Sequence, residues 1–166
     1  IILDFEKIVT DINPETGLKM TEIDELGERH RNNVPILIAE DSPLLNKLIV
    51  DSLHKAGYYN LIHTENGQQA YEVIEECKKE GTLKDHVQCI ITDIEMPIMD
   101  GHRLTKLVKS DDLTKDIPVV IFSSLVNEEM KKKGEALGAD AQLSKPEIGN
   151  LVRVVDDLVL NSNQEN

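Results

Sequence analysis

The sequence predicts an α/β fold in which a parallel sheet is covered by helices on both faces. From Val34 onward, short and continuous apolar runs recur along the chain, as in strands that are buried on both sides. Amphipathic stretches separate these runs, so that strand and helix alternate. Right-handed crossovers between parallel strands are the architecture that this alternation favours.

Five apolar runs fit the strands of this sheet. They occupy residues 35–39, 61–63, 89–92, 118–122 and 141–143. The first helix begins at Ser42-Pro43, which suit a cap and a first-turn position, and it stops near Gly57. Further helices are expected at residues 70–77, at the heavily charged residues 127–137, and from Glu147 onward. We therefore expect a flavodoxin-like (βα)5 three-layer sandwich with a central five-stranded parallel sheet.

The predicted domain covers residues 34–161, and residues 162–166 form a polar tail. Before it, residues 1–5 are mainly apolar and residues 13–17 are a turn cluster. Residues 18–33 are polar and have the composition of a linker. The chain starts at Ile1 without an initiator Met, so we expect a fragment whose first 33 residues are the end of an upstream domain and a linker.

The composition excludes several classes of function. The 166 residues include 31 acidic and 18 basic ones, with a net charge of −13, which repels nucleic acid and anionic lipid surfaces. No apolar run approaches the roughly 20 residues of a membrane helix, and a secretory signal pattern is missing. We expect a cytoplasmic protein without membrane insertion. Cys77 and Cys89 lack the spacing of a zinc site, and nothing indicates a disulfide framework.

Chemically active side chains follow four of the predicted strands. Ligands of open parallel sheets bind beyond the carboxyl ends of the strands. The residues there are Glu40 and Asp41, Asp93, Ser123, and Lys145. Each has an ordinary explanation on its own, as a helix cap, a turn acid, a loop hydroxyl or a solvated lysine. Those explanations do not account for all of them at one edge of one sheet, so we favour a joint functional site.

The acids of this edge predict a magnesium site. Three carboxylates within a few ångströms repel one another, and a divalent cation removes that cost. Mg²⁺ suits a site with few protein ligands because it keeps several waters. Asp93 is central and is the candidate nucleophile toward phosphorus. Lys145 would neutralise charge on the transferred group.

Four segments resemble the response-regulator receiver family, which is CheY-like. They are IAEDS at residues 38–42, ITDIEMPIMDG at 91–101, PVVIFSS at 118–124 and LSKP at 143–146. The resemblance implies that Asp93 accepts a phosphoryl group from a histidine kinase and that Ser123 is the conformational trigger. It also implies that Glu40, Asp41, Asp93 and the carbonyl of Glu95 hold Mg²⁺, and that Lys145 contacts the phosphoryl group. The chain departs from the family at Gln142, where an aromatic residue is frequent.

The first residues, IILDFEKIV at 1–9, resemble the end of a CheW-like chemotaxis coupling domain. A CheW-like domain joined to a receiver is the arrangement of CheV-type coupling proteins. This resemblance implies a CheA-like histidine kinase and the chemoreceptor coupling assembly as partners. The protein would then be a signalling phosphoacceptor that modulates coupling or adaptation, and not an enzyme acting on other substrates.

Other functions remain open at this stage. A haloacid-dehalogenase-type phosphatase would need Asp where the chain has Glu95. A phosphorylation-independent pseudo-receiver would usually have lost an acid or the lysine, and a receiver of a non-chemotaxis response regulator would carry the same motifs. In the family, residues equivalent to Glu95 and Leu125 govern access of water to the acyl phosphate. The apolar Leu125 therefore predicts a long-lived phosphate.

Overall fold

The computed structural model describes residues 31–124 and 127–164. The apolar start and most of the predicted linker, together with Leu125, lie outside these residues, and so do residues 165 and 166. The predictions about these residues stay predictions.

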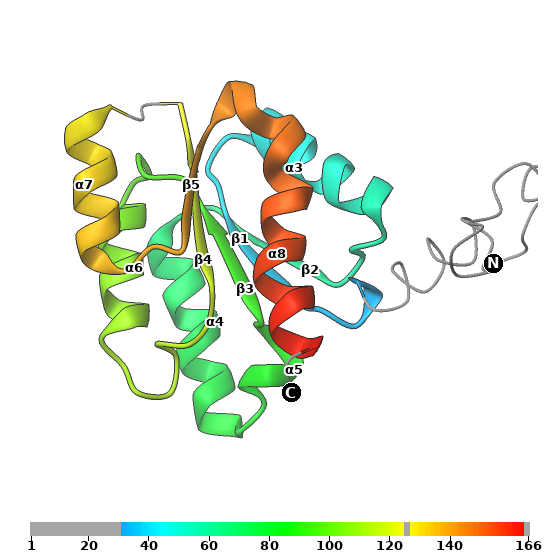
Figure 1. Cartoon of the computed structure of the whole chain (residues 1–166). Helices are drawn as coiled ribbons and strands as arrows, with labels where there is room; N and C mark the ends of the chain where they lie inside the picture. The colour runs from blue at the N-terminus through cyan, green and yellow to red at the C-terminus, as the bar shows by residue number, and fades with distance from the viewer. Residues whose placement is uncertain (1–30, 125–126, 165–166) are drawn as a thin grey trace, which may run out of the picture.

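Five parallel strands form one sheet in the order β2-β1-β3-β4-β5. Figure 1 shows them side by side between the helices. This topology confirms the predicted flavodoxin-like fold. The strands are β1 (Ile36–Ala39), β2 (Leu61–Thr64), β3 (Cys89–Thr92), β4 (Val119–Ser123) and β5 (Ala141–Ser144).

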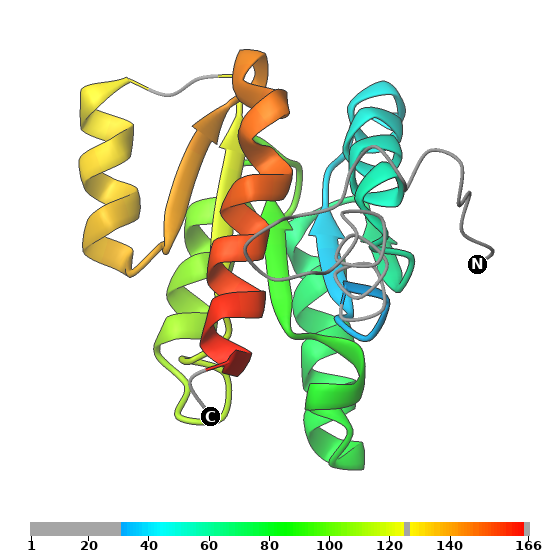
Figure 2. The same cartoon turned by 45° about the vertical axis from the view of Figure 1, so that its right-hand side comes forward.

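Helices cover both faces of the sheet. The two on one face are α3 (Pro43–Ala56) and α8 (Leu151–Gln164). The other face carries α4 (Gly67–Glu80), α6 (Gly101–Lys109) and α7 (Glu128–Leu137), with the short α5 (Leu83–His86) at the end of α4. Figures 1 and 2 show the resulting three layers from two directions.

Two apolar clusters fill the spaces between the layers. Alternate residues of the strands point to opposite faces, so Ile36 and Ile38 of β1 pack with α3 and α8 while Leu37 packs with α4 and α6. The central strands β1 and β3 are buried along their whole length. This explains why their sequences are continuously apolar and do not alternate.

Local capping sets the start and the end of α3 as the sequence predicts. The backbone N–H of Leu45 donates to Ser42 Oγ at 3.3 Å, and Pro43 occupies the first turn. At the other end Gly57 has a φ of 102°, a conformation that favours glycine. The helix begins directly after the acidic pair that follows β1.

The last helix differs from the expectation. It begins at Leu151 instead of Glu147, because a 3₁₀ segment, η2 (Lys145–Asn150), precedes it. Glu147 has non-helical backbone angles, and its carboxylate accepts from the backbone N–H of Ser144 at 3.0 Å and from its hydroxyl at 2.8 Å. The helix continues to Gln164, past the boundary predicted at residue 161.

A polar triad, formed by Arg31, Tyr58 and Asp156, links the beginning of the described chain to α8. Arg31 donates from Nε and Nη2 to the two carboxylate oxygens of Asp156, at 3.1 and 2.9 Å. The buried hydroxyl of Tyr58 donates to the same carboxylate at 2.6 Å. Bidentate and charge-assisted bonds of this kind are among the stronger ones in proteins. Among the helices in the described ranges, none combines the length and the apolar composition of a membrane span.

Candidate functional site

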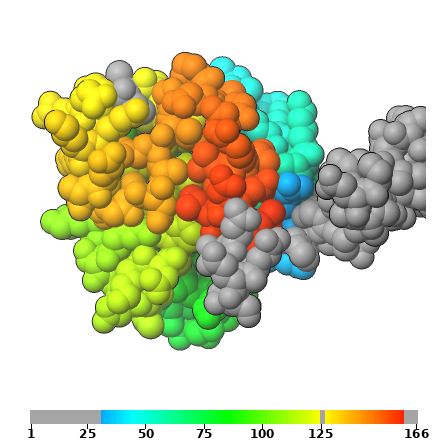
Figure 3. Space-filling view, viewed as in Figure 1, coloured from blue at the N-terminus to red at the C-terminus, as the bar shows by residue number. Residues whose placement is uncertain are grey.

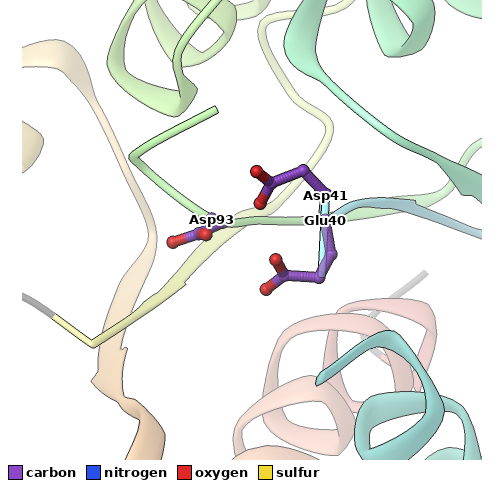
Figure 4. Close-up of side chains that lie close together, drawn as sticks. All are labelled: Glu40, Asp41 and Asp93. Atoms are coloured by element: carbon purple, nitrogen blue, oxygen red, sulfur yellow. The ribbon is translucent and has the colours of Figure 1, made fainter. Parts of the chain in front are cut away.

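The register of the central strands brings the predicted acids together. Ala39 of β1 pairs with Thr92 of β3, so Glu40 and Asp93, the residues that follow, lie side by side. Glu40, Asp41 and Asp93 each offer a carboxylate oxygen, and these oxygens lie within 4.8 Å of one another. Figure 4 shows the three side chains at the ends of the two strands. The structure thus brings together three of the four predicted metal-binding residues.

Burial makes this cluster electrostatically costly. The exposed fraction is 1% for Glu40 and 6% for Asp93, whereas Asp41 is exposed. The pKa of Glu40 is raised to about 7, mainly by burial and also by the nearby Asp93 charge. A hydrogen bond from the Ser42 N–H and the charge of Lys145 act in the opposite direction. Near neutral pH the site therefore binds a proton or a cation more readily than an ordinary surface acid does.

The donor set fits a hard divalent cation. Glu40 Oε2 accepts from the Ser42 N–H at 3.1 Å, whereas the buried Glu40 Oε1 has no hydrogen-bond partner among the described residues. A buried carboxylate oxygen without a partner is unfavourable unless a cation approaches it. Oxygen ligands from two strand ends, with one side open, match the preference of Mg²⁺ for few protein ligands and several waters.

The loop that follows β3 fixes the orientation of Asp93. The Ile94 N–H donates to Asp93 Oδ1 at 2.8 Å, and the Gly101 N–H donates to the Ile94 carbonyl at 2.9 Å. A Cβ at Gly101 would lie 1.8 Å from the carbonyl oxygen of Asp93, so only glycine permits this approach. Asp100 caps α6 by accepting from the Arg103 N–H at 2.8 Å. The Asp100-Gly101 pair therefore has a structural role in positioning Asp93.

The remaining predicted residues lie at the same edge. Ser123 ends β4 and is buried, and its strand partner is Ser144, the residue before Lys145. Lys145 is half-buried, and its charge lowers the pKa of Glu40. Glu95 is exposed, and its carboxylate is not part of the cluster of three acids. Its predicted contribution, through the carbonyl, stays a prediction.

Sequence reasoning missed His63. Its Nε2 lies 2.9 Å from the carbonyl oxygen of Glu40, so the ring links β2 to the first acid of the cluster. Thr64, which follows it, donates from Oγ1 to the Ile38 carbonyl at 2.8 Å. Both residues stand at the carboxyl end of β2, and inspecting that strand end in the same way as the other four would have revealed them.

Gln142 has a definite packing role in the structure. Its Nε2 donates to the Lys131 carbonyl of α7 at 2.9 Å, and its Oε1 is buried without a partner among the described residues. Gly134, the buried residue of α7, lies against it: a Cβ there would be 2.4 Å from Gln142 Oε1. The side chain at the position where the family often has an aromatic residue therefore attaches β5 to α7.

These motifs and their geometry agree with the comparison with known families. Residues 36–156 match the response regulator receiver domain. The chain belongs to this family.

Among curated proteins, the chain is similar to chemotaxis protein CheV1 of Helicobacter pylori, with 32% identity over 155 residues. The match covers 93% of this chain and 47% of CheV1. The phosphate regulon transcriptional regulatory protein PhoB of Pseudomonas aeruginosa is 33% identical over 111 residues, which cover 67% of this chain and 44% of PhoB. The chain thus spans about half the length of the curated relatives that it matches.

Solved structures show the same fold. The signal receiver domain of a signal transduction histidine kinase from Syntrophus aciditrophicus superposes with a TM-score of 0.66 at 28% identity. The superposition covers 77% of this chain and 91% of that structure.

Proposed function

We propose that this receiver accepts a phosphoryl group from a histidine kinase on Asp93, with Mg²⁺ bound beside it. The observation that carries the proposal is the cluster of Glu40, Asp41 and Asp93 with the unpartnered Glu40 Oε1. Glu40 and Asp41 would hold the metal together with Asp93 and the Glu95 carbonyl. The bound Mg²⁺ would supply a positive charge that compensates the acids and the incoming phosphate oxygens.

Several residues of this chain would have distinct roles in the phosphoryl transfer. An oxygen of Asp93 forms a bond to phosphorus while the bond from phosphorus to the kinase histidine nitrogen breaks, and the imidazole keeps that electron pair. The hydrogen bond from the Ile94 N–H holds the other oxygen and orients the attack. Lys145, next to the cluster, stabilises charge on the transferred oxygens. Ser123 would then move toward the phosphoryl group and signal the change.

We further propose a place in a chemotaxis pathway, as the receiver of a CheV-type coupling protein in the cytoplasm. The CheV1 match supports this because it covers 93% of the chain and so extends into residues 1–33, beyond the receiver. A CheA-like kinase would be the phosphodonor, and the upstream domain would contact the chemoreceptor assembly. The similarity to PhoB, which involves less of the chain, keeps a non-chemotaxis response regulator as the second candidate.

Phosphorylation can be tested with acetyl phosphate and intact-protein mass spectrometry. We expect the wild type to gain one phosphoryl group with Mg²⁺ and none with EDTA. Asp93→Asn should stay unlabelled, since the amide is nearly isosteric with the carboxylate but is a poor nucleophile. Asp85→Asn removes an exposed acid on α5 and is the matched control, which should be labelled normally. Labelling of Asp93→Asn at the wild-type rate would disprove the assignment.

The pathway can be tested by competition between kinases. A phosphorylated CheA-like kinase should transfer its phosphoryl group to the chain faster than an equally phosphorylated kinase of a phosphate-sensing system does. Equal or reversed rates would favour the second candidate while leaving the phosphoacceptor role intact.

A further inference from the structure

Two neighbouring helices carry a positive surface on an acidic chain. Together α6 and α7 contain six Lys or Arg residues and three Glu residues, whereas the whole chain has a net charge of −13. The helices lie in contact, and their surfaces adjoin at the left-hand side of Figure 3. The cations are Arg103, Lys106 and Lys109 on α6 and Lys131, Lys132 and Lys133 on α7.

Helix geometry and electrostatics place these side chains. Lys106 follows His102 by four residues and so lies on the same side of α6. Lys133 of α7 lies close enough to lower the pKa of His102, although burial of the imidazole is the larger cause. Lys131 lies on another side of α7, as its effect on the pKa of Glu147 indicates. Lys132 points outward between them. We call Arg103, Lys106, Lys132 and Lys133, all exposed, the α6–α7 cationic strip.

The cations of the strip lack ion-pair partners, in contrast to several other lysines of the protein. Lys47 and Lys109 form ion pairs with Asp51 and Asp140, each at 2.8 Å, and Lys78 pairs with Asp111. No cation of the strip forms an ion pair within 4.0 Å in the described parts of the chain, not even Lys133 with Glu129 four residues before it. The mutual repulsion of the strip is therefore left uncompensated by the fold.

A buried histidine, His102, lies beneath the strip. His102 is 5% exposed, and its Nε2 has no hydrogen-bond partner among residues 31–124 and 127–164. Burial and, to a smaller extent, the Lys133 charge lower the pKa of His102, which favours the neutral form of the imidazole. In its neutral form the His102 ring adds no charge to the strip. An anion bound over the strip would change the NMR signals of this ring.

We propose that the α6–α7 cationic strip is a docking surface for an acidic segment of a partner protein. Packed helices have axes about 8–10 Å apart, close to the roughly 11 Å rise of two helical turns. An acidic helix with carboxylates two turns apart could therefore meet Lys106 and Lys133 together. Nucleic acid fits less well, because the rest of the acidic surface repels a long polyanion.

The proposal can be tested with the full chain and a defined probe. The probe is a fluorescein-labelled helical peptide of about 18 residues with glutamates one and two turns apart on one face. Binding is followed by fluorescence anisotropy at low salt, and the His102 imidazole is followed by NMR. We expect the triple variant Arg103→Gln/Lys106→Gln/Lys133→Gln to bind about tenfold more weakly, from the loss of three exposed ion pairs. The wild-type imidazole signals should shift on binding.

A second triple variant separates a local site from general charge. Lys55→Gln/Lys79→Gln/Lys84→Gln removes three other exposed lysines and should keep its affinity within about twofold. Equal losses in both variants, or no binding by the wild type, would overturn the proposal. Equal or tighter binding of a DNA duplex of the same charge as the peptide would also overturn it, in favour of a nucleic-acid surface.

Discussion

Replacing Gly134 by Ala in α7 should destabilise this protein, although alanine is the better helix former. In an open helix the change is worth about 1 kcal/mol in favour of alanine. Here the added Cβ would lie 2.4 Å from Oε1 and 2.7 Å from Cδ of Gln142. The amide must move away, which breaks its hydrogen bond to the Lys131 carbonyl.

The magnitude follows from these contacts. Loss of the hydrogen bond costs about 1 kcal/mol. Overpacking costs about 1 kcal/mol, the low end of its usual range, because the atoms that must move are at the far end of the flexible Gln142 side chain. Subtracting the helix propensity gain of about 1 kcal/mol, we expect Gly134→Ala to lower the free energy of unfolding by about 1 kcal/mol. In a Gln142→Ala background the space is free, and the same change should stabilise the fold by about 1 kcal/mol. The coupling between the two sites is then about 2 kcal/mol.

Urea denaturation followed by circular dichroism on the four proteins of this cycle measures the coupling. Gly149→Ala is the matched control, because a Cβ there would meet nothing within 4 Å, and its effect should be the same in both backgrounds. A Gly134→Ala change that stabilised both backgrounds equally would refute the reasoning. It would mean that Gln142 does not restrain α7.

Three further predictions concern the site and the anchor of the chain. The raised pKa of Glu40, about 7, means that without Mg²⁺ stability should fall as pH rises from about 4.5 to 7, by at most roughly 3 kcal/mol. The stability difference between Mg²⁺ and EDTA samples should therefore widen over that range, and a constant difference in denaturation experiments would contradict this. Asp156→Asn should destabilise the fold by about 1–3 kcal/mol, since Arg31 and Tyr58 lose a charged acceptor. A double-mutant cycle with Arg31→Gln that gave no coupling would argue against the triad. Ser123→Ala should still accept phosphate while the backbone NMR shifts of α7 on adding a phosphoryl mimic become smaller; unchanged shifts would exclude it as the trigger.

Much of the fold follows from local pattern. The positions of β1 and β3 and the start of α3 could be read from the sequence, because continuous apolar runs and capping residues act within a few residues of themselves. The start of the last helix was harder to predict. The sequence predicted that the last helix begins at Glu147, but the bonds between Glu147 and Ser144 favour a 3₁₀ segment that periodicity does not reveal.

By itself the sequence determined which reactive side chains follow the strands and that they lie at one edge of the sheet, since the residues that follow parallel strands must meet there. Only the tertiary structure decided how the acids differ. The pKa of Glu40 depends on its burial and on Asp93, which is distant in sequence but adjacent through the β1–β3 register. The contact of Gln142 with Gly134 likewise joins a strand and a helix whose separate patterns show only an unusual polar residue and a mid-helix glycine. Such pairings depend on how elements pack across the sheet, which local propensities do not encode.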